Sequence, residues 1–188
     1  MIRACWMASG CLGLVLAGCQ QQNPGAGAGS NASLPAMAST NAPSPVRGWS
    51  PTNAQPRLQT LKLYLGSEVV TAELAMTKPQ VMTGMMFRKE MPENEGMLFV
   101  FGVPHRAAFY MRNTTVPLTA AYIDSEGTIL ELHDLQPLKE EAVEAATDNV
   151  QYVLEMNQGW FQRHHVGVGA ILTTEIGQFK ETFGFRHQ

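Results

Sequence analysis

The stretch TLKLYLGSEVVTAEL, residues 60–74, is the part of this chain that most directly indicates its fold. From Thr60 to Leu65, apolar and polar side chains alternate, which is the pattern of a strand with one buried face. Gly66 and Ser67 then permit a tight turn, and residues 68–74 return as a second run rich in β-branched side chains. The stretch therefore predicts a β-hairpin.

The segment after this hairpin predicts one helix. Thr77 and Gln80 have the spacing of a capping box, and Pro79 is tolerated in the first turn of a helix. We expect the helix to extend to about Arg88. Gly84 lies inside it and costs about 1 kcal/mol relative to alanine, which indicates close packing against a neighbouring backbone.

The rest of the folded part consists mainly of strand signals. Residues 97–101 form a continuous apolar run, which predicts a strand buried on both faces. Further strands are expected at residues 107–111, 118–123, 128–135, 150–156 and 169–172, with a helical turn at 160–165. The acidic stretch 139–148 is either a short helix or a mobile loop. Because strands dominate, we predict a single α+β domain over residues 59–188, with a strongly bent or barrel-like sheet, one clear helix and one or two short helical turns.

The beginning of the chain has the pattern of an export signal. Arg3 provides a cationic start, and a short apolar run leads to Cys19. This run is too short for a membrane-spanning helix, which needs roughly 20 apolar residues. Leu16-Ala17-Gly18-Cys19 resembles the lipobox of bacterial lipoproteins, in which the cysteine receives lipid. We expect residues 1–18 to be a lipoprotein signal peptide and Cys19 to be lipidated; an ordinary secretory signal is the alternative.

The residues after Cys19 predict where the protein is held. By resemblance to lipoprotein sorting rules, Gln20 favours the outer membrane, with the domain facing the periplasm. Residues 19–58 are rich in Gly, Ala, Ser, Asn and Pro, which predicts a flexible tether that reaches roughly 35 Å. The membrane, contacted through the lipid on Cys19, is thus one expected partner. Cys11 is a poorer lipidation site, because Ala8 stands where a leucine is expected.

Removal of the signal peptide would change the cysteine content and the charge of the chain. Cys5 and Cys11 would leave with the signal and Cys19 would carry lipid, so the folded part has no thiol. This excludes disulfides, a cysteine nucleophile and a thiolate metal site. Losing Arg3 would change the formal net charge from −3 to −4. The chain has no basic footprint for nucleic acid.

Several motifs in order resemble a known family. They are Gly84-Met85-Met86-Phe87-Arg88, residues 96–101, residues 109–114 with Pro117-Leu118, and Tyr152-Val153-Leu154-Glu155 with Gly159. Together they resemble the signature of domain-of-unknown-function family 192, over roughly residues 61–172. The resemblance implies a compact β-rich domain that is often exported and has no established biochemical role.

This chain departs from the family pattern at three positions. The family usually has tryptophan where Tyr110 stands, and aspartate where Thr119 and Ala170 stand. If those aspartates serve chemistry in relatives, this chain has lost it. If they are caps or turn formers, only local hydrogen bonding has changed.

The loop after residues 107–111 carries the best candidates for ligand binding. Arg112, Asn113 and Thr114 offer a guanidinium, an amide and a hydroxyl, which suit a small polar or anionic ligand. We predict a ligand-binding site composed of Arg88, Tyr110, Arg112, Asn113, Thr114 and Glu155, with Met86, Met97 and Met111 as its floor. The alternative is structural, with Arg88 paired to Glu155 and Asn113 bonded to backbone groups.

Metal binding and catalysis have weaker support. The pair His164 and His165 lacks the spacing of a helical zinc site, so no metal or other cofactor is expected there. Met82, Met85 and Met86 have helical spacing, with Met91 and Met97 nearby, and thioethers suit Cu(I), but scattered methionine is more often core filler. Glu131, Asp134 and Glu155 leave open an enzyme that acts on envelope glycans. An interaction scaffold, with a broad exposed apolar patch, is a further alternative.

Overall fold

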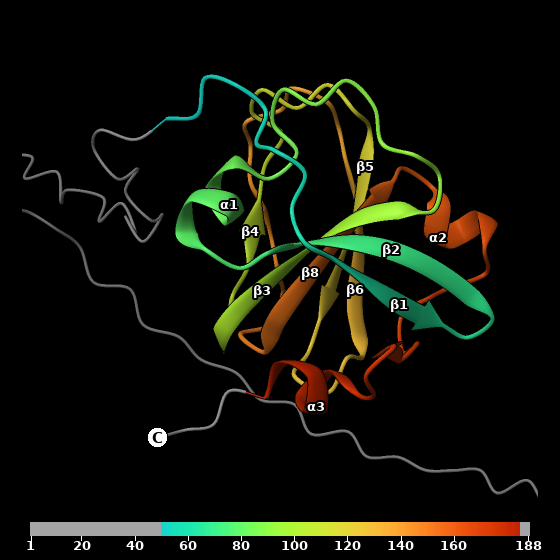
Figure 1. Ribbon diagram of the computed structural model, residues 1–188. Coiled ribbons are helices and arrows are strands. Elements are labelled where there is room, and N and C mark those ends of the chain that lie inside the picture. The colour runs from blue at the N-terminus through green and yellow to red at the C-terminus, as the bar shows by residue number, and fades with distance from the viewer. Residues whose placement is uncertain (1–49, 185–188) are drawn as a thin grey trace, which may run out of the picture. The chain divides into compact units, whose positions relative to one another are not determined.

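The computed structural model describes residues 50–184 (Figure 1). The predicted signal peptide, Cys19 and the tether up to residue 49 lie outside the described residues. A seven-stranded sheet has the strand order β6-β5-β8-β3-β2-β1-β9. Its strands are β1 Thr60–Leu65, β2 Glu68–Ala75, β3 Glu95–His105, β5 Leu118–Ile123, β6 Ile129–Leu135, β8 Val150–Asn157 and β9 Leu172–Thr174. The two-residue strands β4 Ala108–Phe109 and β7 Val143–Glu144 pair separately, and the helices are α1 Lys78–Thr83, α2 Trp160–Arg163 and α3 Phe179–Phe183.

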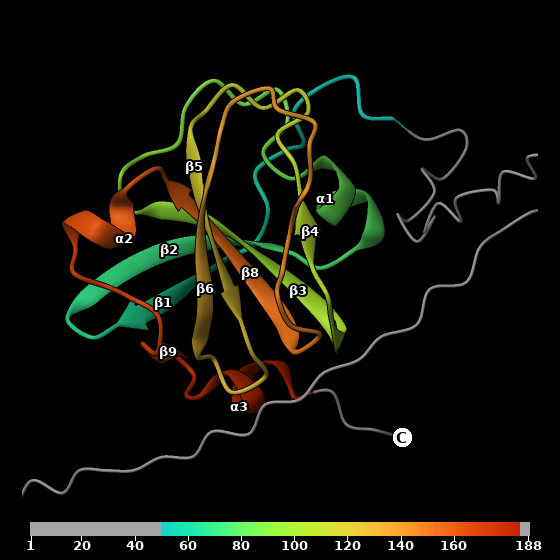
Figure 2. The same ribbon diagram turned by 180° about the vertical axis from the view of Figure 1, so that it is seen from behind.

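The sheet curls strongly on itself (Figures 1 and 2). The isolated bridge between Thr128 and Ile171 lies beside β6 and β9, the two ends of the strand order, and so brings the sheet's edges together. The predicted α+β class with a barrel-like sheet is confirmed. The predicted hairpin is also confirmed, since β1 and β2 pair antiparallel with Leu63 opposite Val70.

Alternation along the strands divides the buried side chains into two cores. The first core takes side chains from all seven strands of the sheet and from α2 and α3; it includes Leu63, Leu154 and Trp160. The second core lies on the opposite face, toward the residues after α1 and toward β4; it includes Met97, Phe99, Met111, Tyr122 and Val153. Because side chains alternate along β8, Leu154 points into the first core and its neighbours, Val153 and Glu155, toward the second.

The predicted helix is shorter than expected. Helix α1 ends at Thr83, and Gly84 has a positive φ of 48°, a conformation that favours glycine. A side chain on Gly84 would also lie 3.2 Å from the Phe99 ring, so its close neighbour is an aromatic side chain and not the predicted backbone. The start was predicted correctly, because the Thr77 N–H donates to Gln80 Oε1 at 2.9 Å.

Three short elements differ from the prediction. The stretch 139–148 contains strand β7, in which Val143 pairs with Phe109 of β4. The last strand begins at Leu172 and not at Gly169, because Gly169 is in a turn with φ of 87°. Helix α3 was not expected; it packs Phe179 against Tyr152 at one end of the first core. Among residues 50–184, no helix combines the length and apolar character that crossing a bilayer requires.

Candidate functional site

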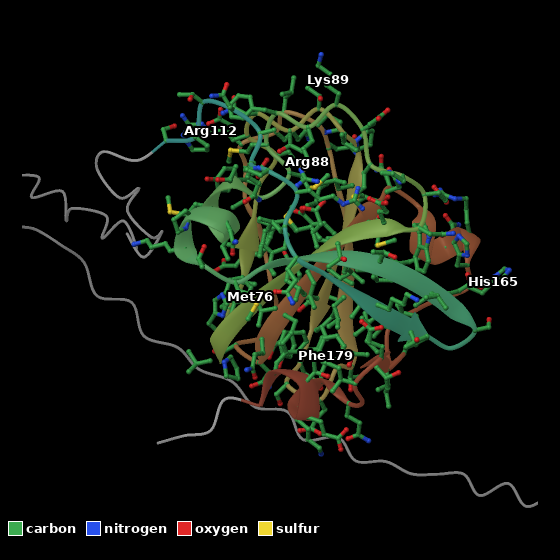
Figure 3. All side chains as sticks on the ribbon, viewed as in Figure 1. Met76, Arg88, Lys89, Arg112, His165 and Phe179 are labelled. Atoms are coloured by element: carbon green, nitrogen blue, oxygen red, sulfur yellow. The ribbon has the colours of Figure 1, made fainter. Side chains whose placement is uncertain are left out.

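Three loops meet at one end of the domain and carry all the predicted site residues except Glu155, which lies on β8. We call residues 84–91, 110–115 and 136–142 the loop end. The middle loop is held on both sides by backbone hydrogen bonds: the Phe87 N–H donates to Asn113 O at 2.7 Å, and the Leu138 N–H donates to Thr114 O at 3.0 Å. Figure 3 shows Lys89 and Arg112 at this end, far from Phe179.

The loop end contains three residues in the left-handed region of backbone space. They are Phe87, Asn113 and Leu138, with φ of 64°, 54° and 62°. Asparagine tolerates this conformation, but it is unfavourable for bulky residues such as Phe87 and Leu138. Such strain persists only where the surroundings impose it, and it often accompanies function. Phe87 and Leu138 are also exposed, at 36% and 60%.

The predicted residues of the middle loop differ in how exposed their side chains are. The Arg112 side chain is exposed and has no ion-pair partner among the described residues. Thr114 is buried, and its hydroxyl donates to Arg112 O at 3.2 Å, so it stabilises the loop. Asn113 is half-buried, and its backbone oxygen accepts the Phe87 N–H. Tyr110 is 42% exposed.

A hollow of about 180 Å³ opens beside Tyr110. Its apolar lining includes Phe109, Leu135 and Val143, and its charged lining consists of Asp134, Lys139 and Glu141. The Met111 N–H donates to Lys139 O at 2.7 Å, which fixes the two walls relative to each other. Lys139 and Glu141 have no ion-pair partner in the described part of the chain. We call this space the Tyr110 hollow.

Arg88 binds a glutamate that sequence reasoning did not identify. Its Nη1 and Nη2 donate to the two carboxylate oxygens of Glu73, at 2.6 and 2.8 Å, and the Leu58 N–H donates to Glu73 Oε2 at 2.7 Å. The expected alternative pair of Arg88 with Glu155 is therefore wrong. Burial alone would raise the pKa of Glu73, but the hydrogen bonds from Arg88 and Leu58, with nearby positive charge, lower it overall.

Glu155 is buried, and one of its two carboxylate oxygens is unsatisfied in the described structure. It is 4% exposed, its Oε2 has no hydrogen bond within the described structure, and its strand neighbours are Met97 and Ala120. Burial in this apolar setting raises the pKa of the Glu155 carboxyl to about 8, so it is mostly protonated at neutral pH. It lines neither the Tyr110 hollow nor the two larger hollows beside α3 and beside Asn157.

The chain just before β1 is fastened to the domain. Gln55 Nε2 donates to Gly84 O at 2.9 Å and to Gln80 O at 3.2 Å, and Arg57 pairs with Glu95 at 2.8 Å. Leu58 packs against the second core. The described part of the predicted tether, residues 50–58, thus includes a stretch bound to α1 and to the sheet.

One of the departures from the family pattern has a local structural explanation. Thr119 Oγ1 accepts the Gly159 N–H at 2.9 Å and donates to Asp134 at 2.6 Å. Position 119 therefore caps the turn before α2, and a hydroxyl can do this in place of a carboxylate. Ala170 lies in the turn before β9, where its backbone oxygen accepts the Ile129 N–H.

The other candidate chemistry finds little support in the described residues. His164 Nδ1 lies 2.9 Å from Glu68 Oε2, and the His164 ring stacks on Trp160. No group of three His, Asp, Glu or Cys suited to a metal occurs in residues 50–184. Met85, Met97 and Met111 share the second core, as core filler would. Glu131 bonds to His133 and to the Ala146 N–H.

Sequence reasoning missed Glu73, Lys139 and Glu141. Glu73 alternates with apolar neighbours in β2 and has the pattern of a solvent-facing residue, although residues 57–58 and Arg88 cover it. Lys139 and Glu141 stand in the acidic stretch, for which the pattern does not distinguish helix from loop. The β-branched residue Val143 could have indicated a strand in that stretch, because it lies in β7, which pairs with β4.

Comparisons with known proteins agree with this fold. The family model DUF192, described as an uncharacterised ACR family, matches residues 62–174. A crystal structure from Sinorhizobium meliloti, named provisionally as a transcription regulator, is 34% identical with a TM-score of 0.57 and aligns over 61% of this chain and 92% of its own. A protein of unknown function from Novosphingobium aromaticivorans is 31% identical with a TM-score of 0.58, over 61% and 85% of the two chains. No curated protein matches.

Proposed function

The chain belongs to domain-of-unknown-function family 192, and we propose that it is a lipid-anchored cell-envelope domain that binds a small polar or anionic ligand at the loop end. The single observation that carries the binding proposal is the Tyr110 hollow, which adjoins the loop of Arg112. Arg112 follows Met111, a lining residue, and its guanidinium is not used by another side chain of the described structure. A site on loops that a rigid sheet supports is a common arrangement for binding.

The proposed site is smaller than the predicted set. It comprises Tyr110, Arg112, Asn113 and Thr114, of which Thr114 and Asn113 hold the loop in place. Arg88 and Glu155 are left out of it, because Arg88 is paired with Glu73 and Glu155 is buried on β8. We therefore assign these two residues to the stability of the domain and not to the ligand.

Replacement of Arg112 tests the binding site. In thermal-shift titrations of residues 50–188 with inorganic phosphate, acetate, glucosamine and leucine, at least one probe should stabilise the domain. At 100 times Kd the gain is about 2.7 kcal/mol. Arg112→Ala should weaken that probe about 10- to 100-fold, because a charge-assisted hydrogen bond contributes roughly 1.5–3 kcal/mol. The domain suffices for this experiment, since the similar solved chains consist mostly of it.

Lys89→Ala is the matched control for this substitution. Lys89 is another exposed cation of the loop end, and it lines neither the Tyr110 hollow nor the two larger ones. It should leave the shift unchanged. Equal stabilisation of Arg112→Ala and the parent domain by phosphate, acetate or glucosamine, or a panel in which no probe stabilises the parent, would refute the proposed site.

The lipid anchor is tested at Cys19. Cys19→Ser should abolish incorporation of labelled palmitate and release the protein from the membrane fraction, because each buried methylene contributes about 0.8 kcal/mol to anchoring. Cys11→Ser is the control, and it should be labelled and sediment like the parent. Labelled Cys19→Ser protein would show that the anchor has been assigned to the wrong residue.

The alternatives are less well supported by the described residues. A glycan-acting enzyme needs two available carboxylates, whereas Asp134 accepts the Thr119 hydroxyl and Glu155 is buried. The regulator name of the Sinorhizobium protein does not transfer, because the acidic balance of this chain lacks a nucleic-acid footprint. A Cu(I) site and a scaffold remain separate proposals, which copper titration and the search for a broad apolar patch would address.

A further inference from the structure

The charges of three surface hollows differ in one respect. The hollow between α3 and the end of β3, about 230 Å³, contains Lys180 and Glu126, which pair at 2.8 Å. The hollow beside Asn157, about 510 Å³, contains Arg163 and Glu93, which pair at 2.7 Å. In both, the cation and the acid neutralise each other.

The Tyr110 hollow instead keeps its charges available. Lys139 and Glu141 both line it, both are exposed, and neither has an ion-pair partner among residues 50–184. Asp134 also lines the hollow, but its carboxylate already accepts the Thr119 hydroxyl. One cation and one acid are therefore free at the mouth of the same small space.

The remaining lining is largely apolar. Phe109, Leu135 and Val143 form part of the wall, and Tyr110 contributes an aromatic ring with a polar tip. The Tyr122 hydroxyl bonds to Val143 O at 2.5 Å, which holds that wall against the sheet. A ligand that fits this space would present a compact apolar group to the wall and opposite charges to its rim.

We infer that the Tyr110 hollow binds a small zwitterion with an apolar side chain, as in a free amino acid or the end of a short peptide. Lys139 contacts the ligand carboxylate, Glu141 contacts its ammonium group, and the apolar wall receives its side chain. This inference rests on the proposed function and names its ligand class. A single-signed anion would meet Lys139 but would be repelled by Glu141 and Asp134.

Leucine and its two singly blocked derivatives test the inference. In calorimetric titrations of residues 50–188, leucine should bind at least tenfold more tightly than leucinamide, which lacks the carboxylate, or N-acetylleucine, which lacks the ammonium group. Lys139→Gln should remove the difference between leucine and leucinamide. Glu141→Gln should remove the difference between leucine and N-acetylleucine.

Lys180→Gln is the matched control, because Lys180 is the cation of a hollow whose charges are already paired. It should leave all three affinities unchanged. Equal binding of the three compounds, or tighter binding of phosphoethanolamine, a zwitterionic headgroup without an apolar side chain, would overturn the inference. If phosphate, acetate or glucosamine binds through Arg112 while leucine does not, the proposed function stands and this inference fails. If no probe binds, both fail.

Discussion

Glu155→Met is expected to stabilise the domain, and the gain should increase with pH. Methionine has a similar length and suits the neighbouring Met97. Removing a buried carboxyl whose Oε2 has no hydrogen-bond partner among the described residues should contribute about 1–3 kcal/mol even at low pH. Urea unfolding of residues 50–188 between pH 4 and pH 9 measures this difference.

The pH dependence follows from the raised pKa of Glu155. The folded protein holds this proton up to about pH 8, whereas the unfolded chain loses it near the ordinary value of 4.5. Between these values the folded state binds more protons, so the parent domain loses stability as the pH rises. The loss is about 1.4 kcal/mol per pH unit within this window, and Glu155→Met should not show it.

Glu155→Gln separates ionisation from polarity. Glutamine cannot ionise, so its stability should change with pH as little as that of the methionine variant. It keeps a buried polar group, and it should therefore lack the gain at low pH. If Glu155→Met is less stable than the parent at every pH, the carboxyl has a partner and this description of the second core is wrong.

Arg88→Met is expected to destabilise the domain by about 3–5 kcal/mol at pH 7, because it leaves the buried carboxylate of Glu73 without its guanidinium. The side chains of Arg88 and Glu73 are only 18% and 5% exposed, so water compensates little. Glu73 has a lowered pKa in the folded state, and the stability that it contributes is present above pH 4.5 and is lost as the pH falls through the folded pKa. The cost of Arg88→Met should therefore shrink in acid.

Two further variants give this prediction its controls. Arg106→Met breaks an exposed pair with Asp148, in which the side chains are 45% and 76% exposed, and it should cost less than about 1 kcal/mol. Replacing both Arg88 and Glu73 by methionine should recover much of the loss, although the Leu58 N–H loses its acceptor. If Arg88→Met costs no more than Arg106→Met, the buried pair does not hold the domain together.

Local patterns were sufficient for most strands. Residues 60–74 alternate with period two around a glycine turn, and residues 97–101 form a continuous apolar run rich in strand formers. The predicted hairpin and the predicted buried strand are therefore both correct. The end of α1 was predicted too late because methionines at 85 and 86 continue a helical pattern. Phe99 of β3 packs against Gly84 at the end of α1, and no local pattern shows such a contact.

The candidate site was predictable only in part. The polar composition of residues 112–114 pointed to the loop, but not to which of its side chains face solvent. The partner of Arg88 could not be predicted, because Glu73 lies 15 residues away on β2. The two residues meet because β2 and β3 pair in parallel, with α1 and the loop of Arg88 between them in the sequence. The Tyr110 hollow could not be predicted either, because its lining residues come from β4, β6, β7 and the adjoining loops, which lie far apart in the sequence.

Local sequence patterns predicted the α+β class, the pairing of neighbouring strands and the family, because alternation, turns and ordered motifs are properties of short segments. Which charged side chains form ion pairs, and which stay unpaired, follows from the three-dimensional arrangement of the chain. Ion pairs and hollows depend on distances between segments far apart in the chain, and these distances are set by how the sheet curls. Arg88 is thus paired with Glu73, while Arg112, Lys139 and Glu141 have no ion-pair partner among residues 50–184.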